Sequence, residues 1–552
     1  MKRRLSAVRV LAGIILVIVV ASQASSSANG RKFYNDDPLA REPESQDASK
    51  VAPWDIDLVY DLAENLFARP GDRGPAVRAR NVNTIDEVPD SSWFTNRILA
   101  RPVSVEEASR GPLTGEGPAP GVWSVVEPKQ AGFAPGFTMR DAKGEVWFVS
   151  FDAKGFPEAA TGAILVANKI FWTLGYWQIE NHLVSIRMDQ LAVAESATTR
   201  PPSGKERPMR LDDIEDVLER SHPSADGSYR AIAARAVPGR PLGGFKYYGT
   251  RPDDPNDIVP HEHRRELRAL KVFGAWTNLT DMKAGNTLDA LVTAPDGRGI
   301  VRHYLQDVGS TFGTGANAPH DYDEGWEHLF EGDLTWKRLY TLGFFLQPWQ
   351  TVPYDEHPAI GRFEGTEFDP AAWKPRVPTA AFLRARDDDS FWAARRVMAF
   401  SDEMIRGLVK TGQYSDAKAE AILGGVLIQR RDAIGRTYLP AINPVVNVAL
   451  SDRGLLTFDN AAVSAGVAPA PAGGYTVRWA RFDNNTGQTT ADLGTSASAP
   501  SQAPMPLPSE PGSYIKVEIR AVQPANPSWN APVDAYFRRD GGWKLVGLER
   551  MP

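Results

Sequence analysis

The spacing of apolar residues predicts a small antiparallel sheet with one packed helix between residues 122 and 175. Three short runs alternate apolar and polar side chains, as strands with one buried face do: Val122–Val126, Phe137–Arg140 and Val146–Phe151. Beyond Pro157 the apolar residues recur at helical spacing, and Gly175 is placed to end that helix.

A second group of elements lies between Pro260 and Gly309. An amphipathic helix gathers four apolar side chains on one face: Leu267, Leu270, Phe273 and Trp276. Two apolar runs, residues 288–292 and 300–305, flank the turn Pro295–Gly299, so we expect a β-hairpin. Farther along, the helical spacing predicts three more helices: Trp336–Phe345, Asp388–Thr411 and Ser415–Ile434.

Alternation returns after Val445. It predicts four strands: Tyr475–Phe482, Tyr514–Ala521, Val533–Phe537 and Trp543–Leu548. The Ser-, Ala- and Pro-rich run Ala491–Gly512 is predicted to be a long loop, and a further strand is expected around Phe245–Tyr248. The C-terminal part is therefore predicted to be a small antiparallel β domain, most simply a sandwich.

Composition narrows the range of functions. A chain of 552 residues exceeds a single hydrophobic core, so two or three domains are expected. The net charge is −6 and no long basic run is present, which argues against nucleic acid as a partner. The absence of cysteine excludes disulfides, thiolate metal sites and a lipoprotein anchor.

The N-terminus has the form of an export signal. Met1–Arg4 is basic, Leu11–Ala21 is apolar and Ser22–Ala24 is small, so residues 1–24 predict a signal peptide and a periplasmic or envelope-associated protein. The apolar run is shorter than the roughly 20 residues of a membrane span, and an uncleaved anchor is the alternative. Residues 25–114 are polar and turn-rich, and are expected to form an extension that wraps a body formed later in the chain.

Four polar residues flank the predicted hairpin. Asp281, Lys283 and Asn286 follow the amphipathic helix in the order Asp-x-Lys-x-x-Asn, and Asp307-Val-Gly309 follows the second strand. Carboxylate and amide oxygens are apt ligands for Mg²⁺, and a lysine can neutralise a phosphoryl group in transfer. The structural alternative is that Asp281 and Asn286 cap a turn while Asp307 ends a strand.

This order of helix, polar loop, hairpin and Asp-x-Gly resembles the lower lobe of the protein-kinase-like superfamily. The chain also looks like a family of exported bacterial proteins that is similar in layout to atypical kinases such as the HipA-type toxins and the spore-coat CotH kinases. Five runs carry this likeness: Pro135–Asp141, Trp147–Asp152, Leu174–Tyr176, Pro260–Leu267 and Arg302–Ser310.

The resemblance implies an α+β, bilobal kinase-like fold with a small β-rich upper lobe, a helical lower lobe and a C-terminal antiparallel β-sandwich-like module. The corresponding ranges are 115–255, 256–445 and 446–552. It further implies that Asp281 aligns an acceptor, that Lys283 contacts phosphate, and that Asn286 and Asp307 hold Mg²⁺ with ATP or another nucleotide.

The chain departs from that layout at the nucleotide-binding positions. Ser150 stands where the third strand should carry a lysine, and Gly132–Gly136 is the nearest run to a Gly-rich loop. Lys129 or Lys154 is a candidate substitute for the missing lysine. Glu158 is the candidate carboxylate partner on the helix, although an acidic residue at a helix start also favours the helix dipole.

Two functions of different class remain open. One is an exported phosphotransferase acting on a protein or small-molecule acceptor. The other is a kinase-like binding or scaffold protein without turnover, associated with the envelope through its C-terminal module or an uncleaved N-terminal segment. A hydrolase is more remote, because no Gly-x-Ser-x-Gly motif is present. The run His261–His263 lacks the spacing of a zinc site and is predicted to be a solvated helix start.

Overall fold

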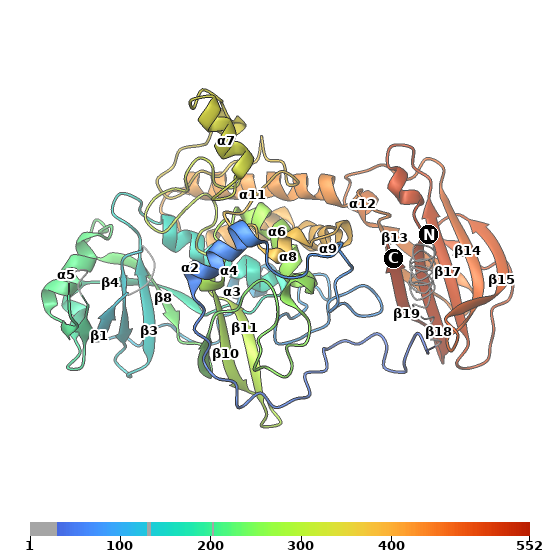
Figure 1. Ribbon diagram of the computed structural model, residues 1–552, viewed down its shortest axis with the longest axis horizontal. Coiled ribbons are helices and arrows are strands. Elements are labelled where there is room, and N and C mark those ends of the chain that lie inside the picture. The colour runs from blue at the N-terminus through green and yellow to red at the C-terminus, as the bar shows by residue number, and fades with distance from the viewer. Residues whose placement is uncertain (1–29, 130–133, 201–203, 552) are drawn as a thin grey trace, which may run out of the picture.

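The computed structural model describes residues 30–129, 134–200 and 204–551, and it confirms the predicted mixed α+β class. Three regions follow one another along the longest axis in Figure 1: a sheet with α5, a central helical region, and a second group of sheets at the red end of the chain. The predicted signal peptide, residues 1–24, lies outside the described residues. Within the described ranges, none of the helices has the length and apolar character needed to cross a membrane.

The first region is a six-stranded sheet with the order β4-β8-β3-β2-β1-β5. Its neighbouring strands pair antiparallel, except for the parallel pair β1–β5. The strands are β1 (Trp123–Pro128), β2 (Gly136–Arg140), β3 (Val146–Phe151), β4 (Asn181–Ile186), β5 (Leu191–Val193) and β8 (Tyr229–Arg235). A short pair, β6 (Thr198–Thr199) and β7 (Arg207–Pro208), lies between them in sequence.

Two helices cover this sheet. α5 (Leu211–Glu219) packs its apolar side against one face, where Trp147 and Val149 of β3 join Ile214 and Val217 in one core. α4 (Ala159–Leu174) contacts β3, β4 and β8. Because side chains alternate along a strand, Ser150 lies on the sheet face opposite to α5.

The central region combines a small sheet with packed helices. The sheet has the order β11-β10-β9, and its strands are β9 (Arg240–Gly243), β10 (Thr287–Thr293) and β11 (Gly299–Leu305). The helices are α6 (Arg265–Thr277), α7 (Gly332–Tyr340), α8 (Ala380–Leu383), α9 (Asp387–Met398), α10 (Asp402–Lys410) and α11 (Ala417–Tyr438). All residues of α6 except Lys271 are buried, so this helix forms the centre of the largest core.

Two expectations for this region are wrong in detail. The helix expected at 388–411 is two helices, because Ser401 caps α10 by accepting a hydrogen bond from the Met404 N–H. The strand expected at 245–248 lies earlier, at β9, while Phe245 enters the core as a loop residue. The predicted hairpin is confirmed as β10 and β11, paired from Thr287–Leu305 to Thr293–Gly299.

The C-terminal region holds two antiparallel sheets that share one core. The five-stranded sheet has the order β15-β14-β17-β18-β19 and the three-stranded sheet β12-β13-β16. Their strands are β12 (Val445–Leu450), β13 (Leu455–Asn460), β14 (Tyr475–Asp483), β15 (Gln488–Ala497), β16 (Ser501–Gln502), β17 (Tyr514–Ala521), β18 (Val533–Asp540) and β19 (Gly542–Arg550), with the short helix α12 (Ala461–Ser464). The predicted loop 491–512 is therefore wrong in part, because β15 is an edge strand whose side chains are mostly exposed and polar.

Residues 30–114 cross all three regions (Figure 1). Lys32 bonds Glu549 of β19, the Trp54 N–H donates to Leu242 O of β9, and Thr114 bonds Glu180 beside β4. The only longer regular pieces in this segment are α2 (Leu58–Ala63), the π-helical turn η1 (Glu64–Ala68) and α3 (Val105–Arg110). The segment ties separate parts of the body together.

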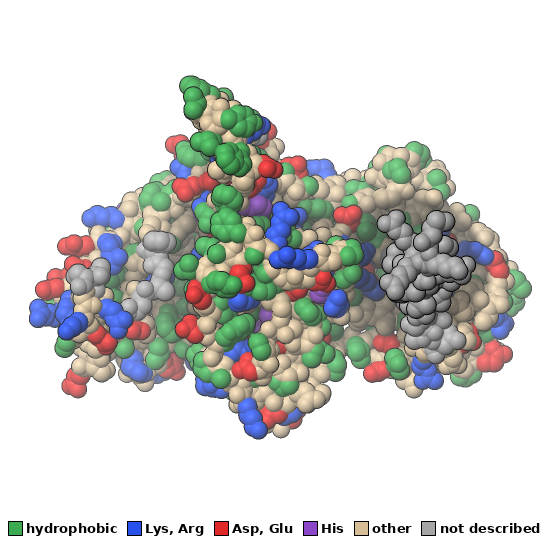
Figure 2. Space-filling view, viewed as in Figure 1, with side chains coloured by type: hydrophobic (Ala, Val, Ile, Leu, Met, Phe, Trp, Pro, Cys, Tyr) green, Lys and Arg blue, Asp and Glu red, His purple; other side chains and the backbone are tan. Residues whose placement is uncertain are grey.

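Helix α7 and the turn after it form an arm that projects from the central region in Figure 1. None of the residues of α7 is buried. Apolar side chains cover much of this arm in Figure 2, and the exposed ones between residues 332 and 344 are Trp336, Leu339, Tyr340, Leu342 and Phe344. These side chains belong to the surface and add nothing to the core.

Candidate functional site

Three of the predicted site residues form one hydrogen-bonded cluster after helix α6. The helix ends at Asn278, which takes the left-handed conformation with φ 54°. The Oδ2 atom of Asp281 then accepts hydrogen bonds from Lys283 Nζ at 2.8 Å and from Asn286 Nδ2 at 3.0 Å. The Asn286 amide also donates to the Asp281 carbonyl at 2.6 Å. The loop is thereby fixed, and among the described residues the amide oxygen of Asn286 accepts no hydrogen bond.

The hairpin brings Asp307 beside Asn286. Thr287 pairs with Leu305, so the next residues of both strands meet at the open end of the hairpin. The N–H groups of Gln306 and Asp307 both donate to Asn286 O, each at 3.1 Å. The side chain of Asp307 is exposed, and its Oδ1 accepts from the Gly309 N–H at 2.9 Å. The four residues expected to act together therefore lie at one place.

The Asp307–Gly309 turn also lies against α4, the helix that contacts β3, β4 and β8 of the six-stranded sheet. A Cβ on Gly309 would lie 2.8 Å from Cγ1 of Ile164 in α4, which is closer than side chains pack. Glycine at this position allows the turn to lie against α4. The loop after α6, the hairpin end and α4 thus meet at Gly309.

Charges at this cluster remain accessible to water. The side chain of Asp281 is 33% exposed and that of Lys283 is 42% exposed. Two buried neighbours feel the charge of Asp281: burial together with Asp281 raises the pKa of Tyr247, and burial lowers the pKa of His320 although Glu324 and Asp281 oppose that shift. Both neighbours are therefore neutral at pH 7, and Asp281 keeps an open side toward solvent.

Lys129 reaches the position where the third strand lacks a lysine. Its Nζ lies 3.5 Å from Oγ of Ser150, and its backbone N–H donates to Gly136 O at 3.0 Å. Gly136 is the partner of Ser150 across the β2–β3 pair. The end of β1 therefore supplies an exposed ammonium group on the sheet face opposite to α5. Residues 130–133, which include the start of the Gly132–Gly136 turn, lie outside the described residues.

Glu158 contacts a different partner. It precedes α4 with φ 65°, and its Oε2 accepts a hydrogen bond from the Ser415 N–H at 2.9 Å. Among the described residues, neither Glu158 nor Lys129 forms an ion pair. Lys154, the other candidate lysine, donates its backbone N–H to Arg220 O. The structure therefore places Lys129 at Ser150, and holds Glu158 against the loop between α10 and α11.

The predicted solvated helix start at His261–His263 is wrong. All three side chains are buried, and His261 Nε2 lies 2.8 Å from Asp257 Oδ2. Burial lowers the pKa of His261, but the Asp257 carboxylate outweighs burial and raises it overall. The arginines that follow are also buried: Arg264, Arg265 and Arg268. The carboxylate partners of Arg265 and Arg268 lie 121 to 179 positions away in sequence, so no local pattern could reveal these pairs.

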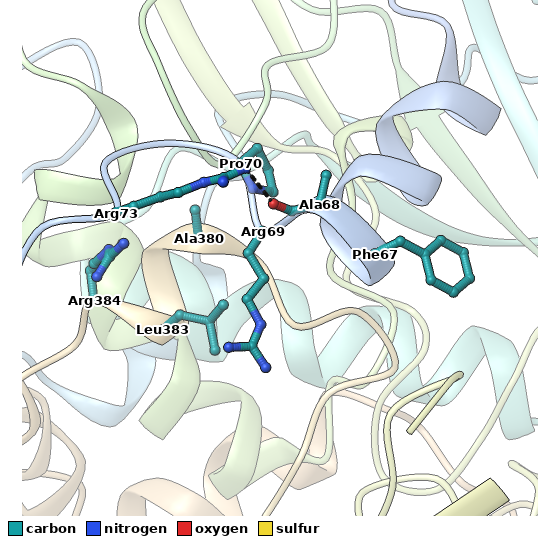
Figure 3. Close-up of a pocket in the computed structure, with 8 residues that line it drawn as sticks. All are labelled: Phe67, Ala68, Arg69, Pro70, Arg73, Ala380, Leu383 and Arg384. Carbon is teal, nitrogen blue, oxygen red and sulfur yellow. Dashed lines mark hydrogen bonds between the residues drawn. The ribbon is translucent and has the colours of Figure 1, made fainter. Parts of the chain in front are cut away.

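A surface cavity of about 430 Å³ adds a second candidate binding place. Figure 3 shows three arginines around it, Arg69, Arg73 and Arg384, with Leu383 between Arg69 and Arg384. Arg73 donates to Ala68 O and Arg384 to Gly74 O. Arg384 is far from Arg69 and Arg73 in the sequence, so the sequence alone does not show that the three side chains line one cavity. The lining offers cationic donors and apolar contacts, and it contains no carboxylate.

This cavity is joined to the polar cluster by one short helical segment. A Cβ on Gly285 would lie 3.1 Å from Leu58 at the start of α2, and Phe67 at the end of η1 lines the cavity. Nine residues of helix span on the order of 14 Å. The cavity and the loop around Asp281 are thus neighbouring features of the central region.

Within the described ranges, no group of three or more His, Cys, Asp or Glu side chains is arranged to hold a metal ion. The oxygens of Asn286 and Asp307 still fit Mg²⁺, because this ion binds through one or two protein oxygens together with phosphate and water. Comparisons with protein-family models, curated proteins and solved structures give no match.

Proposed function

We propose that this chain is an exported kinase-like protein that binds a nucleotide with Mg²⁺ and transfers its phosphoryl group. The observation that carries the proposal is the meeting of Asp281, Lys283, Asn286 and Asp307 at one end of the β10–β11 hairpin. A capped turn would need only part of this set. The side-chain oxygen of Asn286 and the second carboxylate oxygen of Asp307 accept no hydrogen bond among the described residues, so they contribute nothing to holding the fold.

The arrangement of elements supports a two-lobed, kinase-like body. β1, β2 and β3 pair in order, α4 follows, and β4 and β8 then return to extend the sheet beside β3. The polar cluster lies in the helical region, against α4. The shared core of the two C-terminal sheets supports the sandwich-like module.

The cluster suggests a role for each side chain. Asn286 and Asp307 have oxygen atoms suited to a cation, which when bound would neutralise phosphate charge. Asp281 is held by Lys283 and Asn286 through Oδ2, so its other oxygen is available to orient an acceptor hydroxyl. Lys283 and Lys129 offer positive charge to phosphate oxygens from the two lobes.

The alternative is a kinase-like envelope protein that binds a partner without turnover. Ser150 favours it, because a serine cannot supply the positive charge of the missing lysine. The engagement of Glu158 with Ser415 also favours it, since within the described part of the chain no carboxylate then pairs with Lys129. The phosphotransferase would act on a protein or small-molecule acceptor. The binding protein would likewise recognise a protein or small molecule.

A thermal-shift titration of the purified chain with ATP, GTP and other nucleotides separates these functions. Binding to the folded state raises the melting temperature by mass action, so we expect a rise that requires Mg²⁺ or Mn²⁺. No rise with any nucleotide would exclude the enzyme and leave the binding protein.

Export rests on residues 1–24 and is a separate proposal. We expect the mature N-terminus near Ser25. N-terminal sequencing of exported material that found Met1 would instead support an uncleaved anchor.

A further inference from the structure

A serine, a histidine and a glutamate lie in a chain of contacts just beyond the Asp-x-Gly turn. Oγ of Ser310 and Nε2 of His320 are 2.8 Å apart. On the other side of the ring, Nδ1 lies 3.6 Å from Oε2 of Glu324, which also accepts the Thr280 hydroxyl at 2.6 Å. His320 is buried, whereas Ser310 is partly exposed.

The backbone holds this trio in place. The His320 N–H donates to Gly313 O at 2.7 Å, the Phe312 N–H donates to Thr277 O at 2.7 Å, and Arg362 donates to His320 O. Residues 311–320 are therefore folded back so that His320 returns to Ser310. Such rigid support is what a reacting group requires.

The hydrogen bonding of His320 is incomplete, and a ring that served only to hold the loop in place would not account for this. Nδ1 is buried and has no hydrogen-bond partner among the described residues. Leaving a buried polar atom unpaired costs free energy, so a ring that only tied the loop would be poorly built. When Nε2 accepts the hydrogen of the Ser310 hydroxyl, the single proton of the neutral ring is on Nδ1 and faces the carboxylate of Glu324 at 3.6 Å. Burial lowers the pKa of His320 overall and the carboxylates of Glu324 and Asp281 offset part of that shift, so the resting ring is neutral and able to accept a proton.

We propose that Ser310 is a nucleophile for an electrophilic phosphorus or carbonyl centre, with His320 as its base and Glu324 orienting His320. The arrangement has the nucleophile–base–carboxylate order of serine enzymes without their Gly-x-Ser-x-Gly motif. The N–H of Ser310 donates to no atom of the described residues, so it is free to meet the oxyanion that develops.

The chemical step is balanced within this set. Oγ of Ser310 forms a bond to the electrophilic atom, its proton passes to Nε2 of His320, and the bond to the leaving group breaks with the electron pair on that group. The proton on His320 then neutralises the leaving group. This inference does not depend on the proposed phosphotransferase, because an activated electrophile can supply the leaving group without a nucleotide.

The test treats the purified full-length chain with an alkyl fluorophosphonate, followed by peptide mass spectrometry. We expect an adduct on Ser310, formed faster than on Ser104 or Ser401, whose hydroxyls cap helices. His320→Ala should slow labelling at least about 100-fold, in the range of general-base effects, and Glu324→Gln should slow it less. His357→Ala is the matched control, because His357 pairs with Asp416 elsewhere and its loss should leave the rate unchanged.

Two further measurements identify which electrophile Ser310 attacks. Addition of a phosphoryl group to Ser310 from ATP and Mg²⁺ would identify transfer from a nucleotide, and a burst of p-nitrophenol from p-nitrophenyl acetate would identify acyl transfer. Failure of all three reagents to modify Ser310 in the folded wild type would overturn the proposal, even if the His320 variant does not fold. A labelling rate that is unchanged in both folded variants would overturn it as well.

Discussion

Two groups of charged residues in the central region use the same side chains in opposite ways. Around the start of α6, Arg265 pairs with Asp86, Asp388 and Asp389, and all four side chains are at most 8% exposed. At the end of α6, Asp281 and Lys283 form a pair that is 33% and 42% exposed. The first group joins the N-terminal extension to α6 and α9. The second joins only residues of its own loop.

The comparison separates charges that hold the fold from charges that are available to a ligand. A buried pair has lost its hydration, so removing one partner leaves a charge that nothing compensates, at a cost of about 3–5 kcal/mol. An exposed pair contributes roughly 0–1 kcal/mol, because water solvates either partner alone. An open cluster of Asp, Lys and Asn therefore contributes little to the free energy of folding, and its side chains are available to a ligand.

The largest expected effect is on the buried group. Arg265→Met should lower the free energy of unfolding by about 3–5 kcal/mol, since it removes the buried cation that Asp86, Asp388 and Asp389 share and leaves each of them with fewer arginine partners. Urea denaturation followed by circular dichroism measures it. Arg478→Met is the matched control, because Arg478 pairs with Asp492 at the surface and should change stability by less than about 1 kcal/mol. Equal effects of the two substitutions would refute the distinction.

Lowering the pH should reduce the stabilisation that the buried ion pairs around Asp86 provide. Burial raises the pKa of Asp86, but the guanidiniums of Arg265, Arg550 and Arg78 outweigh it and hold the pKa at about 2. The unfolded chain therefore takes up this proton first as pH falls. The stabilisation is present above about pH 4 and lost as pH falls toward 2, roughly 2 kcal/mol in all.

Denaturation of the wild type and of Asp86→Asn across that pH range measures this effect. The variant starts less stable and should lose stability less steeply between pH 4 and 2. Parallel curves would show that Asp86 does not contribute to acid unfolding.

Substitutions in the open group around Asp281 should change binding or phosphoryl transfer and leave the free energy of unfolding nearly unchanged. Asp307→Asn and Asp281→Asn should each change the free energy of unfolding by less than about 1 kcal/mol. Asp281→Asn should keep nucleotide binding and lose phosphoryl transfer, because its proposed partner is the acceptor. Calorimetric titration and a transfer assay on the same preparation measure both. Loss of binding and transfer together in Asp281→Asn would assign that residue to the nucleotide instead.

The smallest expected change in stability is at Lys129. Lys129→Ala removes an exposed side chain whose hydrogen bond to Ser150 is long, so stability should hold within about 0.5 kcal/mol. Nucleotide affinity should still fall roughly tenfold, as expected for a charged hydrogen bond to phosphate. Lys154→Ala is the control for a nearby lysine. Unchanged nucleotide affinity in Lys129→Ala would show that Lys129 does not replace the lysine that is missing from the third strand.

Local sequence patterns predicted the open group but not the buried one. The hairpin and the loop before it are encoded by neighbouring residues, so spacing alone brought Asn286 and Asp307 together. The partners of Arg265 lie 123 to 179 positions away. The local pattern instead predicted a solvated helix start at the neighbouring residues His261–His263. Lys129 was named from its position beside a turn. Ser310 was missed because its base is ten residues distant and carries no motif.

The central claim is that Asn286 and Asp307 share a cation that a nucleotide also needs. Electron paramagnetic resonance of Mn²⁺ mixed with the chain tests it directly, since free Mn²⁺ gives a sharp signal that binding broadens. We predict strong loss of the free signal when wild-type protein and ATP are both present, beyond that caused by ATP alone, and none of this excess with Asp307→Asn. The same excess loss in wild type and Asp307→Asn, or no excess in the wild type, would contradict the assignment of this site.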